Sequence, residues 1–294
     1  MKKKTFLENK LPSILTKFSK KRYMLVALLA ALVVLSGVIV FSLVLSLQNQ
    51  GFSSARSVFY QKLSALCWVS YAPTHFNPKK GLYPSKETIR EDLKVLYNSG
   101  FRGIVTYGSE KSLKNIPKIA KEEGFSGIIM GVWDPASPEE FKNALDAVKY
   151  VDGYTIGHIG LNDRYSLVEL KQSMKILRKN TKKPVSTTER IGEYFQEKNQ
   201  LLRLGDWLFP DVSLYWEEER KPKEAYNWLV EQYLKLTSKT DKPVLLKTVG
   251  FPSAGGPQMN QSLQAEFFRL ILRNAEYKEE SLRSTLERVS SYRT

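Results

Sequence analysis

Titratable side chains follow several predicted strands of this 294-residue chain. Asp134, Glu189 and the run Glu217–Glu219 supply carboxylates there, and His158 supplies an imidazole. Paired carboxylates can act as general acid and base, and a histidine can titrate near neutral pH. Each residue also has a structural interpretation: a turn residue before Pro135 for Asp134, a solvated loop for Glu217–Glu219, and a hydrogen-bonding side chain for His158. For Glu189 the two interpretations are equally supported.

From residue 66 onward, short β-rich runs alternate with longer amphipathic ones, and these elements must position the titratable groups. The predicted strands are 66–71, 103–107, 127–133, 153–157, 184–188, 207–214 and 244–248. The predicted helices are 86–99, 112–123, 137–149, 166–180, 193–204, 222–239 and 261–275. Ser137 and Ser166 begin capping sequences, with a glutamate three residues later in each case. Gly100 and Gly124 are expected to end helices in the left-handed conformation.

Seven strand–helix alternations predict a parallel α/β fold. A doubly wound open sheet is the alternative, but no glycine-rich phosphate turn follows any predicted strand. We therefore expect a (β/α)8-type TIM barrel, with its site at the carboxyl ends of the strands. The barrel is expected to be incomplete, because residues 275–294 contain no apolar run typical of an eighth strand. Either the barrel is open, another element fills the gap, or the chain is truncated.

The amino-terminal region predicts a membrane anchor. Residues 24–47 are almost wholly apolar, and about 20 such residues span a bilayer as a helix. The preceding segment is rich in lysine, so we expect residues 1–23 to be cytoplasmic and the rest extracytoplasmic. A cleaved signal peptide is the alternative, although its apolar core would be shorter. The expected organisation is therefore a cytoplasmic segment, one transmembrane helix, a connector over 48–64 and a barrel domain over 65–294.

Charge and composition exclude several classes of function. The formal net charge is +15, but the later basic residues are scattered over predicted helices, which favours solvated faces over attraction to an anionic polymer. No basic stripe with interleaved aromatic residues predicts a nucleic-acid site. Cys67 is the only cysteine, so no internal disulfide can form, and we interpret it as a small core residue. We expect no structural zinc site, other metal or cofactor.

Four motifs in a fixed order carry a resemblance to a known family. They occupy residues 68–73, 102–108, 156–162 and 245–256, the last reading LLKTVGFPSAGG. Over about residues 66–256 the chain resembles glycoside hydrolase family 17, the β-1,3-glucanase and glucanosyltransferase barrels. The resemblance implies a retaining site, in which two carboxyl groups lie about 5–5.5 Å apart.

The resemblance places unusual residues at both catalytic positions. Ile159 stands where the family has its acid/base glutamate, and Thr248 stands where it has its nucleophile. Isoleucine has no proton to give, and a threonine hydroxyl is a poor nucleophile without an adjacent base. His158 replaces an asparagine and could still bind a sugar hydroxyl. Glu189 follows the fifth strand, where the resemblance implies a substrate-site acid, and is the candidate substitute carboxylate.

Aromatic residues at the predicted strand ends could stack on sugar rings. Because strand residues alternate between faces, some must point into the core instead, and we expect Trp68 and Trp133 to pack. The residues expected to contact substrate are Tyr71, Tyr107, His158, Asn162, Glu189, Tyr215 and Phe251.

Three hypotheses follow. The first is a membrane-anchored protein that binds a β-glucan-like polysaccharide and is catalytically impaired. The second is an active glycosidase or transglycosidase of β-1,3-glucans that uses relocated carboxylates, Glu189 among them. The third is a decayed, poorly folding product of a truncated gene, which the missing eighth strand would suggest.

Overall fold

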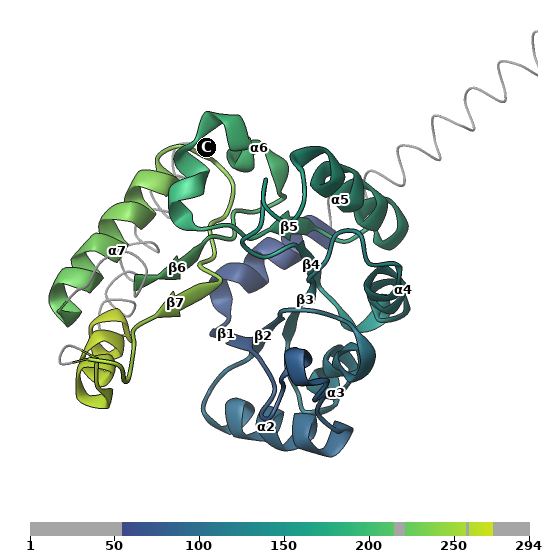
Figure 1. Ribbon diagram of the computed structural model, residues 1–294, viewed down its shortest axis with the longest axis horizontal. Coiled ribbons are helices and arrows are strands. Elements are labelled where there is room, and N and C mark those ends of the chain that lie inside the picture. The colour runs from purple at the N-terminus through teal and green to yellow at the C-terminus, as the bar shows by residue number, and fades with distance from the viewer. Residues whose placement is uncertain (1–54, 215–220, 257–258, 273–294) are drawn as a thin grey trace, which may run out of the picture. The chain divides into compact units, whose positions relative to one another are not determined.

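The computed structural model describes residues 55–214, 221–256 and 259–272. These residues belong to a compact unit, Ala55–Thr294, that is distinct from Met1–Ser54. Parallel strands form its centre and helices surround them (Figure 1). The predicted membrane helix at 24–47 lies outside the described residues. Within the described ranges, no helix is long and apolar enough to cross a membrane.

The strands follow the predicted order. Their bounds are β1 Trp68–Tyr71, β2 Gly103–Thr106, β3 Gly127–Val132, β4 Gly153–Ile156, β5 Val185–Thr187, β6 Asp211–Ser213 and β7 Thr248–Gly250. β1 to β5 form one parallel sheet in sequence order, and β6 and β7 pair with each other. A single bridge between Arg190 and Asp211 continues the array from β5 to β6. The expected α/β barrel-like arrangement of parallel strands is therefore confirmed.

The helices alternate with the strands. Their bounds are α2 Lys86–Asn98, α3 Ile116–Glu122, α4 Pro138–Asp146, α5 Leu167–Thr181, α6 Leu201–Leu204 and α7 Pro222–Thr237, with a last helix at 261–272. Ser166 and Glu169 form the predicted capping box at α5, and Ser137 caps α4. Gly100 and Gly124 have φ of 97° and 96°, in the left-handed region as predicted.

Apolar side chains on both faces of the strands give the barrel two kinds of core. Between strands and helices, Ile104 and Met130 pack with Leu93 of α2 and Leu170 of α5 in the largest cluster. Inside the strand array, a smaller cluster contains Val105, Ile129 and Phe209. Strands buried on both faces are typical of parallel sheets covered by helices.

No strand lies between β7 and β1 in the part of the chain that the structure describes. The two strands are joined instead by a side chain, because the Ser70 hydroxyl donates to the carbonyl of Lys247. The described ranges thus contain no eighth strand, and a hydrogen bond across the gap keeps β1 beside β7.

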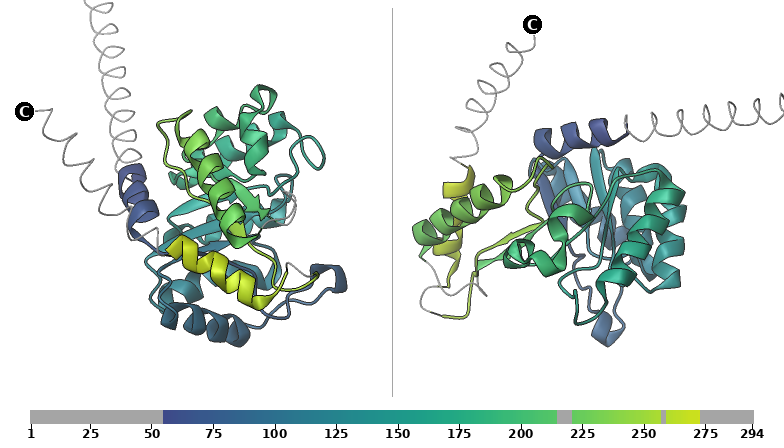
Figure 2. Two further views of the ribbon diagram at one scale, coloured as in Figure 1. Left: turned by 90° about the vertical axis from the view of Figure 1, so that its left-hand side faces the viewer. Right: turned by 90° about the horizontal axis from the view of Figure 1, so that it is seen from above.

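A helix at residues 55–65 lies across the amino-terminal end of the strands (Figure 2). Phe59 is 1% exposed and meets the ring of Trp207 at 4.8 Å, close to the start of β4 at Gly153. Arg56 pairs with Asp206 at 2.6 Å on the same end. Most of this helix falls in the segment that the sequence assigned to a connector. It closes the end of the barrel opposite the candidate site.

Several local expectations differ from the structure. The strand predicted at 244–248 is shifted, because β7 begins only at Thr248. The predicted helix at 193–204 is a pair of short 3₁₀ turns followed by α6, because Gln200 takes a left-handed φ of 53° and interrupts helical geometry. Cys67 was expected in the core but is exposed, since it precedes β1 and does not lie within the strand.

Candidate functional site

A buried lysine lies at the carboxyl end of the barrel. Lys247 is 4% exposed, and its Nζ lies 3.1 Å from Nδ1 of His158, which follows β4. The ammonium also faces the Tyr107 ring, 4.8 Å from its centre. A charged lysine has only donors, so Nδ1 of a neutral His158 accepts this hydrogen bond from the ammonium. The centre of the site is therefore a donor–acceptor pair of two nitrogens.

An irregularity just before β7 explains how Lys247 reaches the interior. Leu208 pairs with Val244, whereas Asp211 pairs with Thr248. From Leu208 to Asp211 the chain advances three residues, whereas from Val244 to Thr248 it advances four. The second segment therefore contains one extra residue, which defines a β-bulge. A bulge lets neighbouring side chains depart from strict alternation, so Lys247 and Thr248 can both lie near the site. Bulges are frequent next to functional sites.

Burial controls the protonation of the central pair. It lowers the pKa of Lys247 to about 7, although Asp211 and Glu189 oppose the change. Burial, with smaller contributions from Lys247 and Arg164, also lowers the pKa of His158 to about 3. His158 is consequently neutral at physiological pH, whereas Lys247 exists in both charged and neutral forms. Either form can donate to Nδ1 of His158.

Glu189 holds the loop that carries His158. Its Oε1 accepts from the backbone N–H groups of Gly160 and Leu161 at 3.1 and 2.9 Å, and from the Tyr165 hydroxyl at 3.0 Å. Burial raises the Glu189 pKa, and these hydrogen bonds oppose the rise. The observed contacts make Glu189 a positioning group for the loop after β4.

Asp211 is a carboxylate on the strand that pairs with β7. It is buried on β6, beside its strand partner Thr248. Burial raises its pKa, while the Thr248 hydroxyl and the charge of Lys247 counteract that rise. Asp211 therefore has the character of a buried acid whose ionisation is coupled to Lys247.

A third buried acid, Glu140 of α4, ties the ends of β2 and β3 together. Its Oε2 accepts from the backbone N–H groups of Ser109 and Trp133 at 2.8 and 2.9 Å. Oε1 accepts from the N–H of Asp134 at 3.1 Å. With both oxygens occupied, Glu140 fixes the direction in which Trp133 leaves β3.

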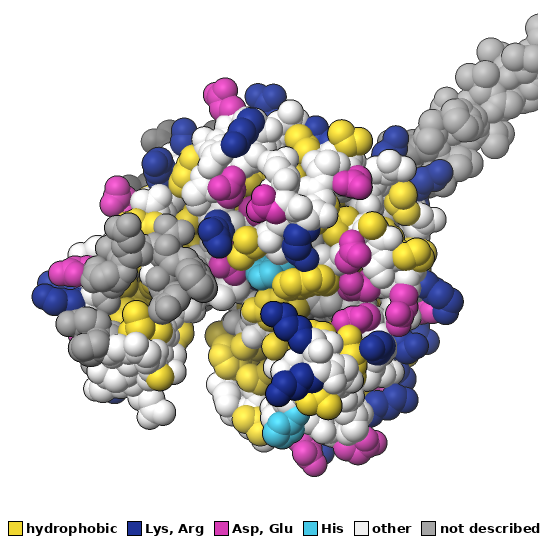
Figure 3. Space-filling view, viewed as in Figure 1, with side chains coloured by type: hydrophobic (Ala, Val, Ile, Leu, Met, Phe, Trp, Pro, Cys, Tyr) yellow, Lys and Arg dark blue, Asp and Glu magenta, His cyan; other side chains and the backbone are white. Residues whose placement is uncertain are grey.

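Aromatic rings line the site. His158 meets Tyr107 edge-on at 5.3 Å and Trp133 at 5.1 Å between ring centres. Arg164 donates to the His158 carbonyl at 2.6 Å, and its guanidinium lies 4.7 Å above the Trp133 ring. Figure 3 shows hydrophobic and basic side chains gathered around the centre of this face. The arrangement offers ring faces and cationic donors to a ligand.

The structure places the predicted site residues differently. Tyr107, His158 and Glu189 come together around Lys247. Tyr71 lines a neighbouring pocket. Phe251 is instead buried in the core, where its ring stacks on Phe267 at 5.1 Å. Tyr215 and Glu217–Glu219 lie outside the described residues.

The loop after β4 contains two residues with unusual backbone conformations. Ile159 has φ of 45°, a strained conformation for a β-branched residue, and its N–H donates to the Thr188 carbonyl. Asn162 has φ of 70° and donates through its side chain to Asn199 at 3.3 Å. Asp134 accepts from Ala136 N–H at 2.9 Å, which matches its interpretation as a turn residue.

The sequence interpretation missed four residues of the site. Trp133 was expected to pack, yet it is 40% exposed, because Glu140 directs its backbone outward. Lys247, Asp211 and Arg164 were not considered as site residues. The available signal was a lysine inside an apolar strand run, since a buried lysine is rare without a specific environment. Across the described residues, no three His, Cys, Asp or Glu side chains are grouped to hold a metal ion.

The fold and the family match together define the class of protein as a glycoside-hydrolase-like α/β domain, with its candidate site at the carboxyl ends of parallel strands. Residues 69–280 match the BtgE/BtgC glycoside hydrolase domain, and the chain belongs to that family. The assignment to glycoside hydrolase family 17 is corrected by this match. No curated protein matches the chain significantly.

Solved structures that are similar to part of the chain include two enzymes. The GH113 β-mannanase AaManA from Alicyclobacillus acidocaldarius shares 12% identity, with 71% of this chain and 81% of that chain covered and a TM-score of 0.48. An enolase from Bradyrhizobium, complexed with magnesium and mandelic acid, shares 14% identity, with 61% and 45% covered and a TM-score of 0.36. The chain spans less than half of that enolase.

Proposed function

We propose that this domain binds a β-glucan-like polysaccharide across its carboxyl-end face and does not cleave it. The observation that carries the proposal is the contact between Lys247 and His158 at the centre of the site. Glycoside hydrolysis usually requires two carboxyl groups on either side of the scissile bond. A lysine and a neutral histidine occupy the centre here.

The surrounding carboxylates support this proposal. Glu189 and Glu140 each accept several hydrogen bonds from the backbone of the loops they hold. Asp211 is 6% exposed and is coupled to Lys247 and Thr248. Freeing Glu189 or Glu140 for chemistry would leave backbone donors without a partner, which costs about 1–3 kcal/mol for each unsatisfied group.

Ring faces and polar groups provide the means to bind a saccharide. Trp133 is partly exposed, and Arg164 and His158 lie beside it. An aromatic ring offers an apolar face to sugar C–H groups, while neighbouring polar groups can pair with hydroxyls. The same three side chains would provide both contributions.

Calorimetric titration of the full chain with laminari-oligosaccharides tests the proposal. We expect saturable binding and no release of reducing ends over days. Trp133→Ala should weaken binding on the order of tenfold, because an aromatic anchor of an interface is often worth more than 1 kcal/mol. Phe268→Ala is the matched control, since Phe268 is 38% exposed but lies on the last helix. An absence of binding, or equal losses in both variants, would sink the idea.

An active glycosidase with relocated carboxylates is the second candidate. Asp211 favours it, because burial raises its pKa, and a raised pKa is typical of carboxyl groups that act as general acids. This candidate predicts turnover that is lost in both Asp211→Asn and Glu189→Gln. Activity that is absent, or unchanged in these variants, excludes it.

The amino-terminal residues complete the proposal. We propose that residues 24–47 anchor the chain, that residues 1–23 remain cytoplasmic, and that the barrel domain is extracytoplasmic. The apolar length of 24–47 and the lysines before it support this topology. Protease treatment of intact cells should remove the barrel domain and leave the amino-terminal segment protected. Protection of the barrel domain would contradict the topology.

A further inference from the structure

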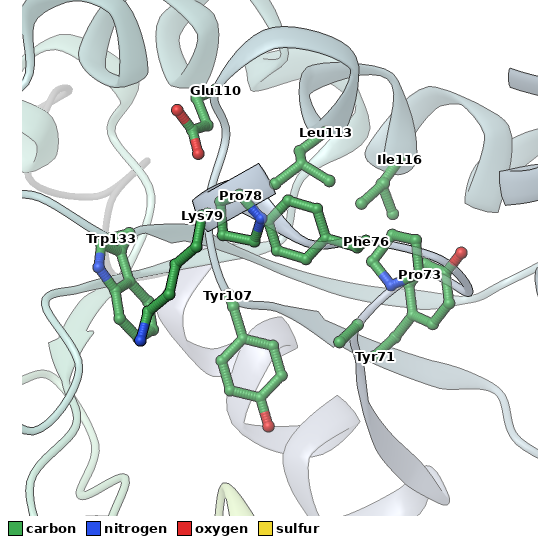
Figure 4. A pocket seen from close by; sticks show the side chains of 12 residues that line it. Tyr71, Pro73, Phe76, Pro78, Lys79, Tyr107, Glu110, Leu113, Ile116 and Trp133 are labelled. Atoms are coloured by element: carbon green, nitrogen blue, oxygen red, sulfur yellow. The ribbon is translucent and has the colours of Figure 1, made fainter. Parts of the chain in front are cut away.

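A pocket of about 420 Å³ opens over the ends of β1, β2 and β3 (Figure 4). Most of its wall is apolar, from Phe76, Pro78, Leu113 and Ile116 together with the rings of Tyr107 and Trp133. Small-molecule pockets typically occupy about 300–1,000 Å³. The pocket is therefore large enough for an organic group of moderate size.

The polar ends of the tyrosines at this pocket are engaged elsewhere. Tyr71 donates its hydroxyl to Asp92 Oδ2 at 2.8 Å. The hydroxyl of Tyr83, whose ring packs on Phe76, donates to Glu110 Oε1 at 2.6 Å. In Figure 4 the Tyr107 hydroxyl points away from the other lining side chains. Apart from the charged side chains of Lys79 and Glu110, the walls consequently present ring faces and aliphatic carbons.

A sugar ring fits such walls poorly. Each hydroxyl that is taken from water without a new partner costs about 1–3 kcal/mol. An apolar group loses no hydrogen bonds there and gains about 25 cal/mol for each Å² removed from water. The lining therefore favours a hydrocarbon group over a further saccharide unit.

The pocket is continuous with the polar centre of the site. Tyr107 and Trp133 line the pocket, and the same two rings contact His158. A ligand with a saccharide part beside His158 and an apolar part beyond these rings would span both regions. Lys79 also lines the pocket and supplies a charged group there.

We propose that this pocket takes the apolar aglycone of a glycoside whose saccharide part lies beside His158. The inference rests on the proposed saccharide binding and adds an aryl or alkyl group to the class of ligand. Burial of a phenyl ring should tighten binding by about tenfold or more over a methyl group.

The test compares methyl, phenyl and octyl glycosides of one laminari-oligosaccharide by calorimetry with the full chain. We expect the phenyl or the octyl glycoside, or both, to bind at least about tenfold more tightly than the methyl glycoside. A preference for phenyl alone identifies an aryl group, and a preference for octyl alone identifies an alkyl chain.

Ala72→Trp provides a variant that fills the pocket without removing a packed side chain, because Ala72 is an exposed residue of its lining. Ala136→Trp is the matched control, since Ala136 is exposed and lies outside the lining. We expect Ala72→Trp to abolish the preference for the apolar aglycone, leave affinity for the methyl glycoside unchanged and fold with the wild-type thermal midpoint.

Two outcomes overturn the inference in distinguishable ways. If the methyl glycoside binds and the apolar aglycones bind no more tightly, or if their preference survives in Ala72→Trp, the pocket has another role while saccharide binding stands. If no glycoside binds, the proposed function fails and this inference fails with it.

Discussion

Replacement of Lys247 by methionine should stabilise the protein at acidic and neutral pH. The lysine is buried, and the only hydrogen bond that its side chain makes within the described residues is to His158. Methionine has similar length and no charge, so it can fill the same space. A buried charge without a close ion pair is generally more costly than an apolar side chain.

The pKa of Lys247 sets the magnitude of the stabilisation expected for Lys247→Met. Its value falls from 10.5 to about 7 on folding, and one pKa unit corresponds to about 1.36 kcal/mol. The charged lysine therefore costs the folded state at most about 5 kcal/mol below pH 7. Loss of the hydrogen bond to His158 offsets about 1 kcal/mol of the gain. We expect a net stabilisation of about 2–4 kcal/mol at pH 6.

The stabilisation by Lys247→Met should decrease as the pH rises. Between about pH 7 and 10.5 the unfolded wild type keeps the proton that the folded protein has lost, so wild-type stability rises with pH. The advantage of Lys247→Met is therefore full below pH 7 and disappears as pH approaches 10.5. Guanidinium unfolding of the full chain at pH 6 and pH 9, followed by tryptophan fluorescence, measures this difference.

Lys242→Met is the matched control. Burial also lowers the pKa of Lys242, but its Nζ donates to the carbonyls of Leu202 and Gly205 at 3.0 and 2.8 Å. Its removal leaves two carbonyls without this donor, so we expect destabilisation. If Lys247→Met is less stable than wild type at pH 6, or if its effect does not change with pH, the assignment of Lys247 as a buried, weakly paired amine is wrong.

Three further variants test other parts of the structure. Phe59→Ala should cost about 3–5 kcal/mol of unfolding free energy, because removal of a fully buried ring leaves a cavity against Trp207. An effect below about 1 kcal/mol in denaturant unfolding would show that helix 55–65 does not close this end of the barrel. Glu189→Gln should destabilise the fold by about 1–3 kcal/mol and increase amide exchange at Gly160, and unchanged exchange would contradict its positioning role. Arg164→Gln should weaken oligosaccharide binding several-fold in calorimetry with little change in thermal midpoint, because the guanidinium stacks on Trp133 at the exposed face. A loss of stability without a loss of affinity would contradict this role.

Local patterns predicted most of the elements. The strands were recognisable because parallel strands covered on both faces are continuous apolar runs. The start of α5 was recognisable because Ser166 and Glu169 satisfy backbone donors within one turn. These signals depend on neighbouring residues only, and the fold class follows from their order.

The features that the sequence did not reveal depend on distant partners. The helix at 55–65 is held in place by Trp207 and Asp206, about 150 residues away in the sequence. The bulge before β7 follows from pairing with the segment that leads into β6, and no local pattern marks it. Without the bulge, alternation gives no reason to place both Lys247 and Thr248 near the site.

The candidate site was predicted in outline only. Tyr107, His158 and Glu189 were expected near a ligand because each follows a strand, and the structure brings them together around Lys247. The role of Glu189 could not be inferred, because its three hydrogen bonds go to a loop that follows a different strand. Phe251 follows β7 but is buried, since the last helix supplies Phe267 to cover it.

One measurement tests the central claim most directly. A laminari-oligosaccharide that binds the full chain saturably is incubated with it for days, recovered, and weighed by mass spectrometry. The Lys247–His158 centre predicts that the oligosaccharide is bound and recovered at its original mass. Shorter products, formed in proportion to the protein and absent with Asp211→Asn, would contradict it.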